Sequence, residues 1–284
     1  MRPGSRSHGW RPDSRPAAKA FPPRRAGPPT QPLRIEDREA LRPFADADPV
    51  VNAVVWDRLY NHTDYTEVWA DALPPKALLA IAPSSRPESP RGFVLHATDP
   101  RAAEVVLEKA PSGPVFFSLT DASLLPLIER RAVSLDAPRF WLFRLDAKDF
   151  VDQQAHEVRP VTPEWAPMIA KIWEPEWPAE RYVRGRIESG PSFGVYVDGE
   201  LVAWDMTHFE TDKVVMMGFL HVLEAHRAKG YAKSMGSALI REILGRGKIP
   251  ACHVREDNTR SLVLTEGLGF RRVRQQVWAD GVLR

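Results

Sequence analysis

The part of the sequence that most constrains the fold is residues 213–244. It opens with KVVMMGFLHV, an apolar run long enough for a buried strand. It closes with a segment in which Met235, Leu239 and Ile243 recur four residues apart, as on one face of a helix. Between them lies a short basic segment, 227–232, that contains Gly230. The first N–H groups of a helix have no partners within it, and the helix dipole adds positive potential there. The stretch therefore predicts a strand, a turn and a helix, with an anion-binding site at the turn.

This turn resembles a known cofactor loop. The spacing Arg-x-x-Gly-x-Ala follows a strand ending in His221-Val222, and it resembles the pyrophosphate loop of the GCN5-related N-acetyltransferase (GNAT) superfamily. From residue 156 the sequence predicts a strand, two helices, three strands, a helix, a strand, a helix and a strand, which is the GNAT order. The resemblance implies an α/β fold with a mixed, mostly antiparallel sheet flanked by helices. An ordinary turn with a solvated basic loop is the alternative.

In that superfamily the loop amides wrap the diphosphate of coenzyme A, so the resemblance implies acetyl-CoA or another acyl-CoA as co-substrate. The backbone of Leu220 and Val222 would pair with the pantetheine amides, which requires the sheet to part between this strand and the strand predicted at 251–254. Asn258 matches an asparagine that contacts the pantetheine in relatives, and it is equally suited to capping the last helix. The full set expected to hold the cofactor is Leu220, Val222, Arg227, Ala228, Lys229, Gly230, Tyr231, Ala232, Lys233 and Asn258.

The rest of the chain divides into a tail and a second domain. A length of 284 residues suggests two domains. Residues 1–32 hold eight prolines, and seven Lys or Arg against one acid, a composition that cannot bury enough surface to order itself. We expect a disordered basic tail. The alternatives are a mitochondrial targeting segment, which the prolines disfavour, and a leader with no physical role.

Residues 33–155 are expected to form a degenerate GNAT-like copy, followed by the catalytic domain at 156–284. Strands predicted at 77–82, 92–97, 114–119 and 138–145 and helices at 100–109 and 122–131 follow the same order as the C-terminal half. The turn after the second strand, however, reads Thr98-Asp99-Pro100-Arg101. Asp99 would cap the helix, and its carboxylate would repel a phosphate. We expect no cofactor there; an unrelated α/β domain is the alternative.

Composition excludes several classes of function. Outside the tail, 32 Lys or Arg face 36 Asp or Glu, so the folded part is not a nucleic-acid platform. No apolar run approaches the roughly 18 residues of a membrane span. Cys252 is the only cysteine, which excludes an internal disulfide, and we expect no metal site. A cytoplasmic protein is expected, and a homodimer is compatible with the sequence.

Three short motifs narrow the resemblance. Val202-Ala203-Trp204, His221-Val222 and the run PACHV at 250–254 look like the glycine N-acyltransferase branch. That branch also carries a degenerate N-terminal copy, and it transfers acyl groups from acyl-CoA to small amines such as amino acids. The implied reaction is direct attack of a neutral amine on a thioester. The alternatives are a protein or peptide N-acetyltransferase and a non-catalytic acyl-CoA-binding regulatory protein.

The catalytic groups are less clearly marked. The N–H of Val222 is the expected donor to the oxyanion. Relatives often place a glutamate where this chain has Met216, so the base is expected among Glu210, Asp212 and His221, the last having a pKa near neutrality when unperturbed.

Trp177, Trp204 and His253 are the candidates for the acceptor pocket, and Trp177 lies in the loop between the first two helices of this half. Thr265 stands where many relatives have a tyrosine acid, so no acid is predicted. Cys252 and His253 are neighbours on one strand and point to opposite faces, so they do not form a dyad.

Overall fold

The computed structural model describes residues 31–86, 88–175 and 178–284. Within them one sheet runs through the molecule in the order β1-β2-β3-β4-β5-β13-β7-β12-β11-β10-β9-β8, with β6 paired to β13. Neighbouring strands are antiparallel except in two pairs, β4 with β5 and β11 with β12. The strands are β1 (Leu33–Arg34), β2 (Glu67–Ala70), β3 (Ala77–Arg86), β4 (Ser89–Ala97), β5 (Gly113–Leu119), β6 (Ala132–Asp136), β7 (Arg139–Arg144), β8 (Arg159–Pro160), β9 (Phe193–Val197), β10 (Glu200–Glu210), β11 (Val214–Val222), β12 (Ile249–Arg255) and β13 (Arg271–Leu283).

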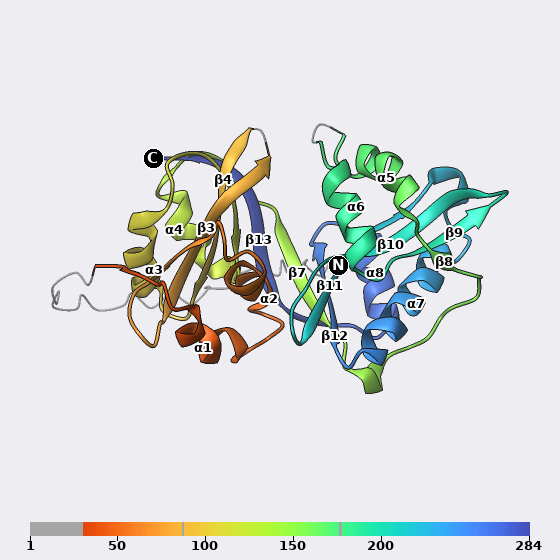
Figure 1. Ribbon diagram of the computed structural model, residues 1–284, viewed down its shortest axis with the longest axis horizontal. Coiled ribbons are helices and arrows are strands. Elements are labelled where there is room, and N and C mark those ends of the chain that lie inside the picture. The colour runs from red at the N-terminus through yellow and green to blue at the C-terminus, as the bar shows by residue number, and fades with distance from the viewer. Residues whose placement is uncertain (1–30, 87, 176–177) are drawn as a thin grey trace, which may run out of the picture.

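Helices cover both faces of each half of this sheet (Figure 1). In the N-terminal half α1 and α2 pack on one face and α3 and α4 on the other; in the C-terminal half α5 and α6 lie opposite α7 and α8. The helices are α1 (Arg42–Asp46), α2 (Ala53–Trp56), α3 (Pro100–Val106), α4 (Leu125–Glu129), α5 (Ala166–Trp173), α6 (Glu180–Ser189), α7 (Tyr231–Gly245) and α8 (Thr259–Gly267), with single turns at Arg38–Leu41, Asp57–Asn61, Leu107–Lys109, Ala122–Leu124, Ala147–Asp149, Pro163–Trp165 and Glu224–His226.

The two halves share one plan and exchange their last strands. Strands β2 to β5 pair as β9 to β12 do, with two antiparallel steps followed by one parallel step. β7, the last strand of the N-terminal half, then pairs with β12, while β13, the last strand of the chain, pairs with β5. β7 and β13 also pair with each other and so join the two halves into one sheet. The predicted fold class, a mixed and mostly antiparallel sheet flanked by helices, is confirmed.

The N-terminal copy begins its first long helix in the way that the sequence predicts. Asp99 is the N-cap of α3, and its Oδ1 accepts a hydrogen bond from the N–H of Arg101 at 2.9 Å. Pro100 follows at the first helical position and has no N–H to offer. β4 and β5 stay paired from Arg91 with Val115 to Leu95 with Leu119. In this half the helix start therefore has fewer free donors, and a carboxylate occupies the place of an anion.

The hairpin between β9 and β10 is the other local feature that the sequence predicts. Asp198 and Gly199 both have positive φ, 52° and 88°, as a tight two-residue hairpin turn requires. β10 then runs to Glu210 and supplies the central strand of the C-terminal half. Its neighbour β11 carries the candidate site at its carboxyl end.

Candidate active site

The turn before α7 leaves a row of backbone donors free. Ala228 and Gly230 have positive φ, 62° and 87°, which bends the chain sharply into the helix. Gly230 is the N-cap and makes no side-chain cap. Within the described part of the chain, the N–H groups from Ala228 to Lys233 have no hydrogen-bond partner, whereas the N–H of Arg227 donates to the carbonyl of Glu224 at 3.2 Å. The anion-binding row therefore begins at Ala228, one residue later than predicted.

The side chains of the turn divide into two groups. Lys229 and Lys233 are exposed and place positive charge beside the free N–H groups. The Arg227 side chain turns back instead, and its Nε donates to the carbonyl of Val222 at 3.1 Å. Ala232 and Tyr231 are partly buried. The arrangement suits a phosphate group, because free amides, a helix N-terminus and two lysines converge on one place.

β11 and β12 part before either strand ends, as the resemblance requires. They pair in parallel only from Val214 with Ile249 to Met217 with Cys252, although both strands continue beyond. The N–H of Leu223 donates to the carbonyl of Val202 on β10 at 2.9 Å. In an extended strand the N–H of the preceding residue points the other way, so that of Val222 faces the gap.

A bulge in β11 accompanies the parting. Trp204 pairs with His221 and Met206 with Gly218, so β11 has one residue more than β10 between these pairs. Phe219 lies in the bulge with φ of 62°, a left-handed conformation that is strained for a bulky residue. The next residue, Leu220, is 36% exposed and lies along the gap. Beyond Met217 the backbone of β11 is thus not paired with β12 on the side that leads to the free N–H row.

Asn258 lies at the start of α8, directly after β12. Its Oδ1 accepts a hydrogen bond from the N–H of Ser261 at 3.2 Å, which is helix capping. Its side chain is exposed. Because the carboxyl ends of the parallel strands β11 and β12 lie at the same edge, Asn258 stands on the same side as the turn before α7. Contact with a cofactor stays a prediction.

The structure brings His221 and Trp204 together. The two rings stack with centroids 4.9 Å apart and planes 21° from parallel. Burial, with repulsion from Arg227, lowers the pKa of His221. Trp204 is 1% exposed and belongs to the core under α5 and α6. It therefore packs against His221 and does not line a pocket. Trp177 lies outside the described residues.

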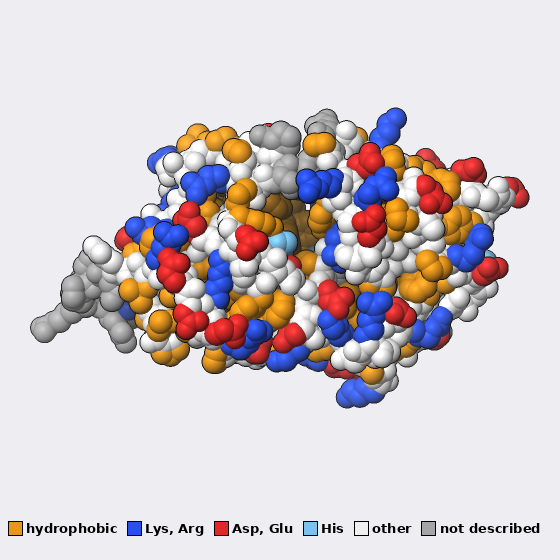
Figure 2. Space-filling model, viewed as in Figure 1, with side chains coloured by type: hydrophobic (Ala, Val, Ile, Leu, Met, Phe, Trp, Pro, Cys, Tyr) orange, Lys and Arg blue, Asp and Glu red, His pale blue; other side chains and the backbone are white. Residues whose placement is uncertain are grey.

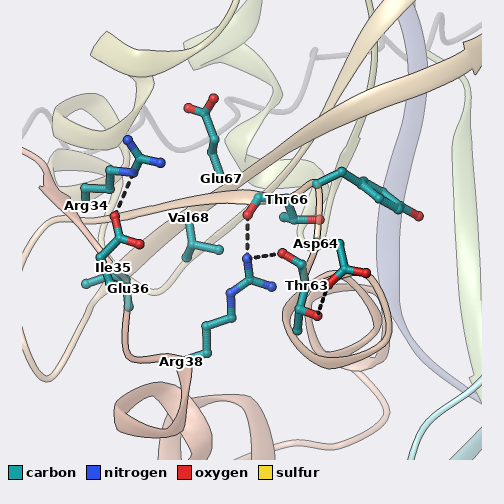
Figure 3. A pocket seen from close by; sticks show the side chains of 10 residues that line it. Arg34, Ile35, Glu36, Arg38, Thr63, Asp64, Thr66, Glu67 and Val68 are labelled. Atoms are coloured by element: carbon teal, nitrogen blue, oxygen red, sulfur yellow. Dashed lines mark hydrogen bonds and ion pairs between the residues drawn. The ribbon is translucent and has the colours of Figure 1, made fainter.

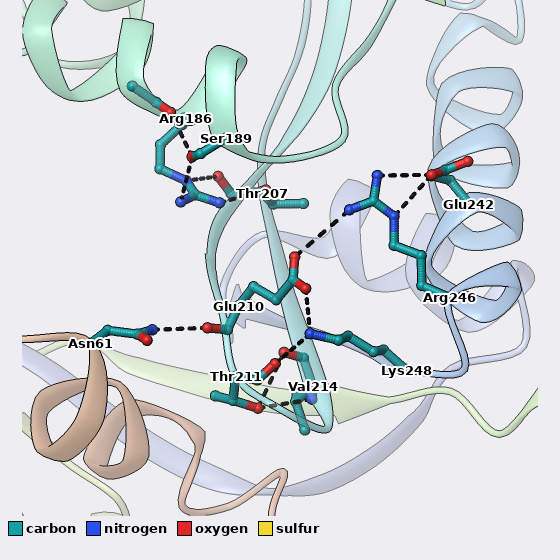
Figure 4. A network of polar contacts seen from close by, with 11 residues as sticks. Asn61, Arg186, Ser189, Thr207, Glu210, Thr211, Val214, Glu242, Arg246 and Lys248 are labelled. Carbon is teal, nitrogen blue, oxygen red and sulfur yellow. Dashed lines mark hydrogen bonds and ion pairs between the residues drawn. The ribbon is translucent and has the colours of Figure 1, made fainter.

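Glu210 and Asp212 are not brought to this site. Glu210 ends β10 beside Val215, roughly 20 Å along the sheet from His221 at about 3.3 Å per residue. Its carboxylate forms ion pairs with Lys248 and, at 3.8 Å, with Arg246, as Figure 4 shows. Asp212 lies in the following turn, where the nearest cation is Arg42 at 3.9 Å. Both acids lie near the β10–β11 turn, at the far end of β11, and face cations there. The longer hairpin that was expected to bring one of them to the site does not form.

An aromatic cluster that the sequence did not reveal covers the bulge. Trp173, Tyr182 and His208 surround Phe219, with ring centroids 4.5, 5.9 and 4.4 Å from its own. The Tyr182 hydroxyl lies 3.3 Å from Nδ1 of His208. Burial raises the pKa of Tyr182 to about 12, and burial together with repulsion from His253 and Arg186 lowers that of His208 to about 3. At neutral pH the pair is therefore an uncharged phenol and an uncharged imidazole.

His208 occupies the space of a missing side chain. A Cβ on Gly218 would lie 2.2 Å from Nε2 and Cδ2 of the His208 ring. Gly218 is the first residue of β11 beyond its pairing with β12. The imidazole of β10 thus fills the space above the sheet that a side chain at position 218 of β11 would occupy. The only signal for this contact in the sequence is Gly218 itself, because a glycine within an apolar strand often marks the close approach of another group.

His253 lies on β12, just past the last pair with β11. Its Nε2 is 2.7 Å from Oε1 of Gln276, while the Gln276 amide nitrogen donates to the carbonyls of Val51 and Thr120, both at 3.2 Å. Because the Gln276 oxygen can only accept, Nε2 of His253 carries the proton and Nδ1 keeps a lone pair. Burial lowers the pKa of His253 to about 4, so the ring stays neutral.

The two halves enclose a hollow near these groups. Figure 2 shows it between β13 and α6, with largely hydrophobic walls and a histidine at its floor. His253 packs edge-on against Trp278 of β13, with centroids 5.3 Å apart. Arg86 of the β3–β4 hairpin lies 3.8 Å from Glu174 after α5 and 3.0 Å from Asp280 of β13, so it links the two halves. The N-terminal half thus forms one wall of the space in front of the parted strands.

A second depression lies elsewhere, at the edge of the N-terminal half. It has a volume of about 320 Å³ and is lined by residues 34–36, 38 and 63–68 (Figure 3). The Arg38 guanidinium donates to the carbonyls of Leu59, Thr63 and Thr66 at 2.6 to 3.0 Å. The arginine that dominates this depression is thus already bound to the chain, and its role is to hold the loop.

A buried acid and the lone thiol lie behind the site. Burial raises the pKa of Asp205, which is 3% exposed, to about 8. Burial and the neighbouring Asp205 raise the pKa of Cys252 to about 12. Both groups are therefore protonated at neutral pH, and Cys252 is a poor nucleophile. Among the described residues no group of three or more His, Cys, Asp or Glu could hold a metal ion, and no helix there is long and apolar enough to cross a membrane.

The strand order, the parted strands and the free amides define a protein with the GNAT fold. Comparisons agree. The model of a family described as FR47-like protein matches residues 192–279. A Drosophila protein superposes with a TM-score of 0.68 at 16% identity, over 88% of this chain and 98% of that chain.

Two further solved structures extend the likeness. A GNAT-family acetyltransferase from Colwellia psychrerythraea gives a TM-score of 0.56 at 11% identity, over 89% of this chain and 100% of that one. A tandem GNAT protein from the clavulanic acid biosynthesis pathway gives 0.55 at 13% identity, over 89% and 97%. None of the curated protein sequences matches this chain. At these identities the likeness shows the fold.

Proposed function

We propose that this protein is an acyl-CoA-dependent N-acyltransferase that moves an acetyl or short acyl group to the amine of a small molecule. One observation carries the proposal: the N–H groups from Ala228 to Lys233 are free, and they follow the segment of β11 that no longer pairs with β12. A strand edge open to backbone pairing, followed by free amides at a helix start, fits a pantetheine joined to a diphosphate. The motif resemblance and the similar solved structures support the same ligand.

The chain supplies groups for the transfer itself. When bound, acyl-CoA provides the thioester; the amine nitrogen bonds to the acyl carbon, the carbon–sulfur bond breaks, and the amine proton must leave. The N–H of Val222 faces the gap and is placed to donate to the oxyanion. The candidates for the proton acceptor are His221, which precedes Val222 on β11, and His208, whose ring stands over Gly218. Tyr182, beside it, keeps its proton and is the proposed donor to the leaving thiolate.

The surroundings favour a small acceptor. Figure 2 shows the hollow between the two halves, and Arg86 of the N-terminal half lies 3.8 Å from Glu174, which follows α5. An enclosed hollow suits a small acceptor better than a flexible protein tail, which needs an open groove. The glycine N-acyltransferase-like motifs point to small amines such as amino acids. A protein or peptide acceptor, and a regulatory protein that binds acyl-CoA without turnover, are the competing proposals.

A thiol-release assay separates these proposals. Purified protein is mixed with acetyl-CoA and, separately, with a panel of amino acids, other small amines and a lysine-bearing peptide, and free thiol is followed. We expect release with at least one small amine and none with the peptide. Release with the peptide alone would favour a protein acetyltransferase. Tight CoA binding with no release from any amine would leave the non-catalytic proposal.

A further inference from the structure

The segment that connects the two halves is built into the start of α7. After β7 and one helical turn, residues 151–158 run along α7 and α8. The N–H of Gln153 donates to Oγ of Ser237 at 2.9 Å. The N–H groups of Ala155 and His156 both donate to Oγ of Ser234, at 3.1 and 3.2 Å. Ser234 is fully buried in the first turn of α7, so the end of the connector is fixed to the helix that carries the free N–H row.

His156, at the end of this connector, forms a hydrogen bond with the turn before α7. Its Nε2 lies 2.6 Å from the carbonyl oxygen of Lys229. A carbonyl oxygen can only accept, so Nε2 carries a proton and donates. The ring stands edge-on to Tyr231, with centroids 4.8 Å apart and planes at 88°. A Cβ on Gly230 would lie 3.4 Å from the same Nε2, so the histidine also underlies the glycine.

This hydrogen bond fixes the direction of one peptide group in the anion site. In a trans peptide the C=O and the N–H point to opposite sides. With the Lys229 carbonyl held toward His156, the N–H of Gly230 is turned away from the histidine, on the side of the free donors. If this peptide flipped, the carbonyl oxygen would face the phosphate and repel it. Ala228 and Gly230, both at positive φ, leave the loop open to such a flip unless something holds it.

We propose that His156 is a positioning residue for the cofactor: it locks the Lys229–Gly230 peptide in its anion-binding orientation, and the connector between the halves carries it into place. The inference rests on the proposed acyl-CoA binding at this loop, which it deepens. It assigns the connector a part in cofactor affinity, although the connector supplies no group to the acyl transfer.

Two substitutions separate the hydrogen bond from the ring. His156→Phe keeps a ring against Tyr231 but removes the donor, whereas His156→Gln keeps an N–H donor without the ring. Losing a hydrogen bond of ordinary strength weakens binding by about threefold to tenfold. We expect His156→Phe to raise the Kd for CoA and the KM for acetyl-CoA by that factor, with kcat and the KM for the amine unchanged. His156→Gln should stay within about twofold of the natural protein on the same scale.

The results of this experiment distinguish a failure of the positioning role from a failure of the proposed function. If the natural protein binds no CoA, the proposed function fails. If it binds CoA and His156→Phe binds equally well, the proposed function stands and the positioning role is overturned. Equal loss in both variants would assign the effect to the ring and would also overturn it. Melting temperatures of both variants show whether the fold survives, and calorimetric CoA titration is read only on folded protein.

Discussion

Replacing Gly230 tests the cofactor site most directly. Gly230 has φ of 87°, and a left-handed conformation costs a residue with a side chain about 1–2 kcal/mol. Valine there would also bring its Cβ to 3.4 Å from Nε2 of His156. The loop can relieve this strain only by rotating to negative φ, which redirects the N–H groups at the start of α7. We therefore expect Gly230→Val to weaken CoA binding at least tenfold, or about 1.4 kcal/mol, in a calorimetric titration.

Gly199→Val is the matched control. Gly199 has φ of 88°, and nothing lies within 4 Å of a Cβ placed there, so the substitution imposes the same strain away from the loop. For a chain of this size each kcal/mol lowers the melting temperature by about 2–4 °C, so both variants should lose roughly 2–8 °C. Only Gly230→Val should lose CoA affinity. If both variants bound CoA as the natural protein does, the assignment of the anion site to this turn would be refuted.

Three further substitutions test the other assignments. Glu210→Gln breaks the ion pair with Lys248 at the far end of β11, so kcat should stay within about twofold in the thiol assay; a drop beyond a hundredfold, as for a lost general base, would contradict the site described. His96 is 6% exposed and burial lowers its pKa to about 4, so its contribution of about 3 kcal/mol is complete above pH 6.5 and lost as the pH falls toward 4. His96→Gln should flatten the fall in melting temperature over that range, and an unchanged slope would disprove this. Burial raises the pKa of Asp205 to about 8, so the stability it contributes is complete below pH 3.8 and lost as the pH rises toward 8. Asp205→Asn should therefore melt higher than the natural protein at pH 8 by more than it does at pH 4, and an equal difference at both would count against a protonated carboxyl.

The sequence predicted the features that neighbouring residues encode. The turn at Asp198-Gly199, the cap at Asp99 and the unpaired start of α7 each depend on a few adjacent residues, and each is present. It missed β2, β6, α1 and α2, which are short and carry little periodic signal. Burial against the sheet, rather than local propensity, holds such elements in place.

The aromatic cluster around Phe219 was largely invisible in the sequence. His208, Tyr182 and Phe219 come together through the pairing of β10 with β11, the bulge, and the packing of α6 over both. A bulge of one residue decides which side chains share a face, and nothing local fixes its position. The same reason explains Glu210: a longer hairpin was expected to bring this acid or Asp212 to the site, while the observed register holds Glu210 beside Val215.

The strand exchange explains why the N-terminal half is needed although it lacks both features of the proposed cofactor site. Asp99 caps its helix, and β4 and β5 stay paired. Yet Val277 and Ala279 of β13 are buried in its core, and Phe143 of β7 and Leu145, which directly follows β7, lie in the core beside α7. Without that half β12 would be an open edge strand, and β13 would lose its partners. The two halves therefore form one structural unit, in which the C-terminal half carries the proposed site and the N-terminal half completes its sheet.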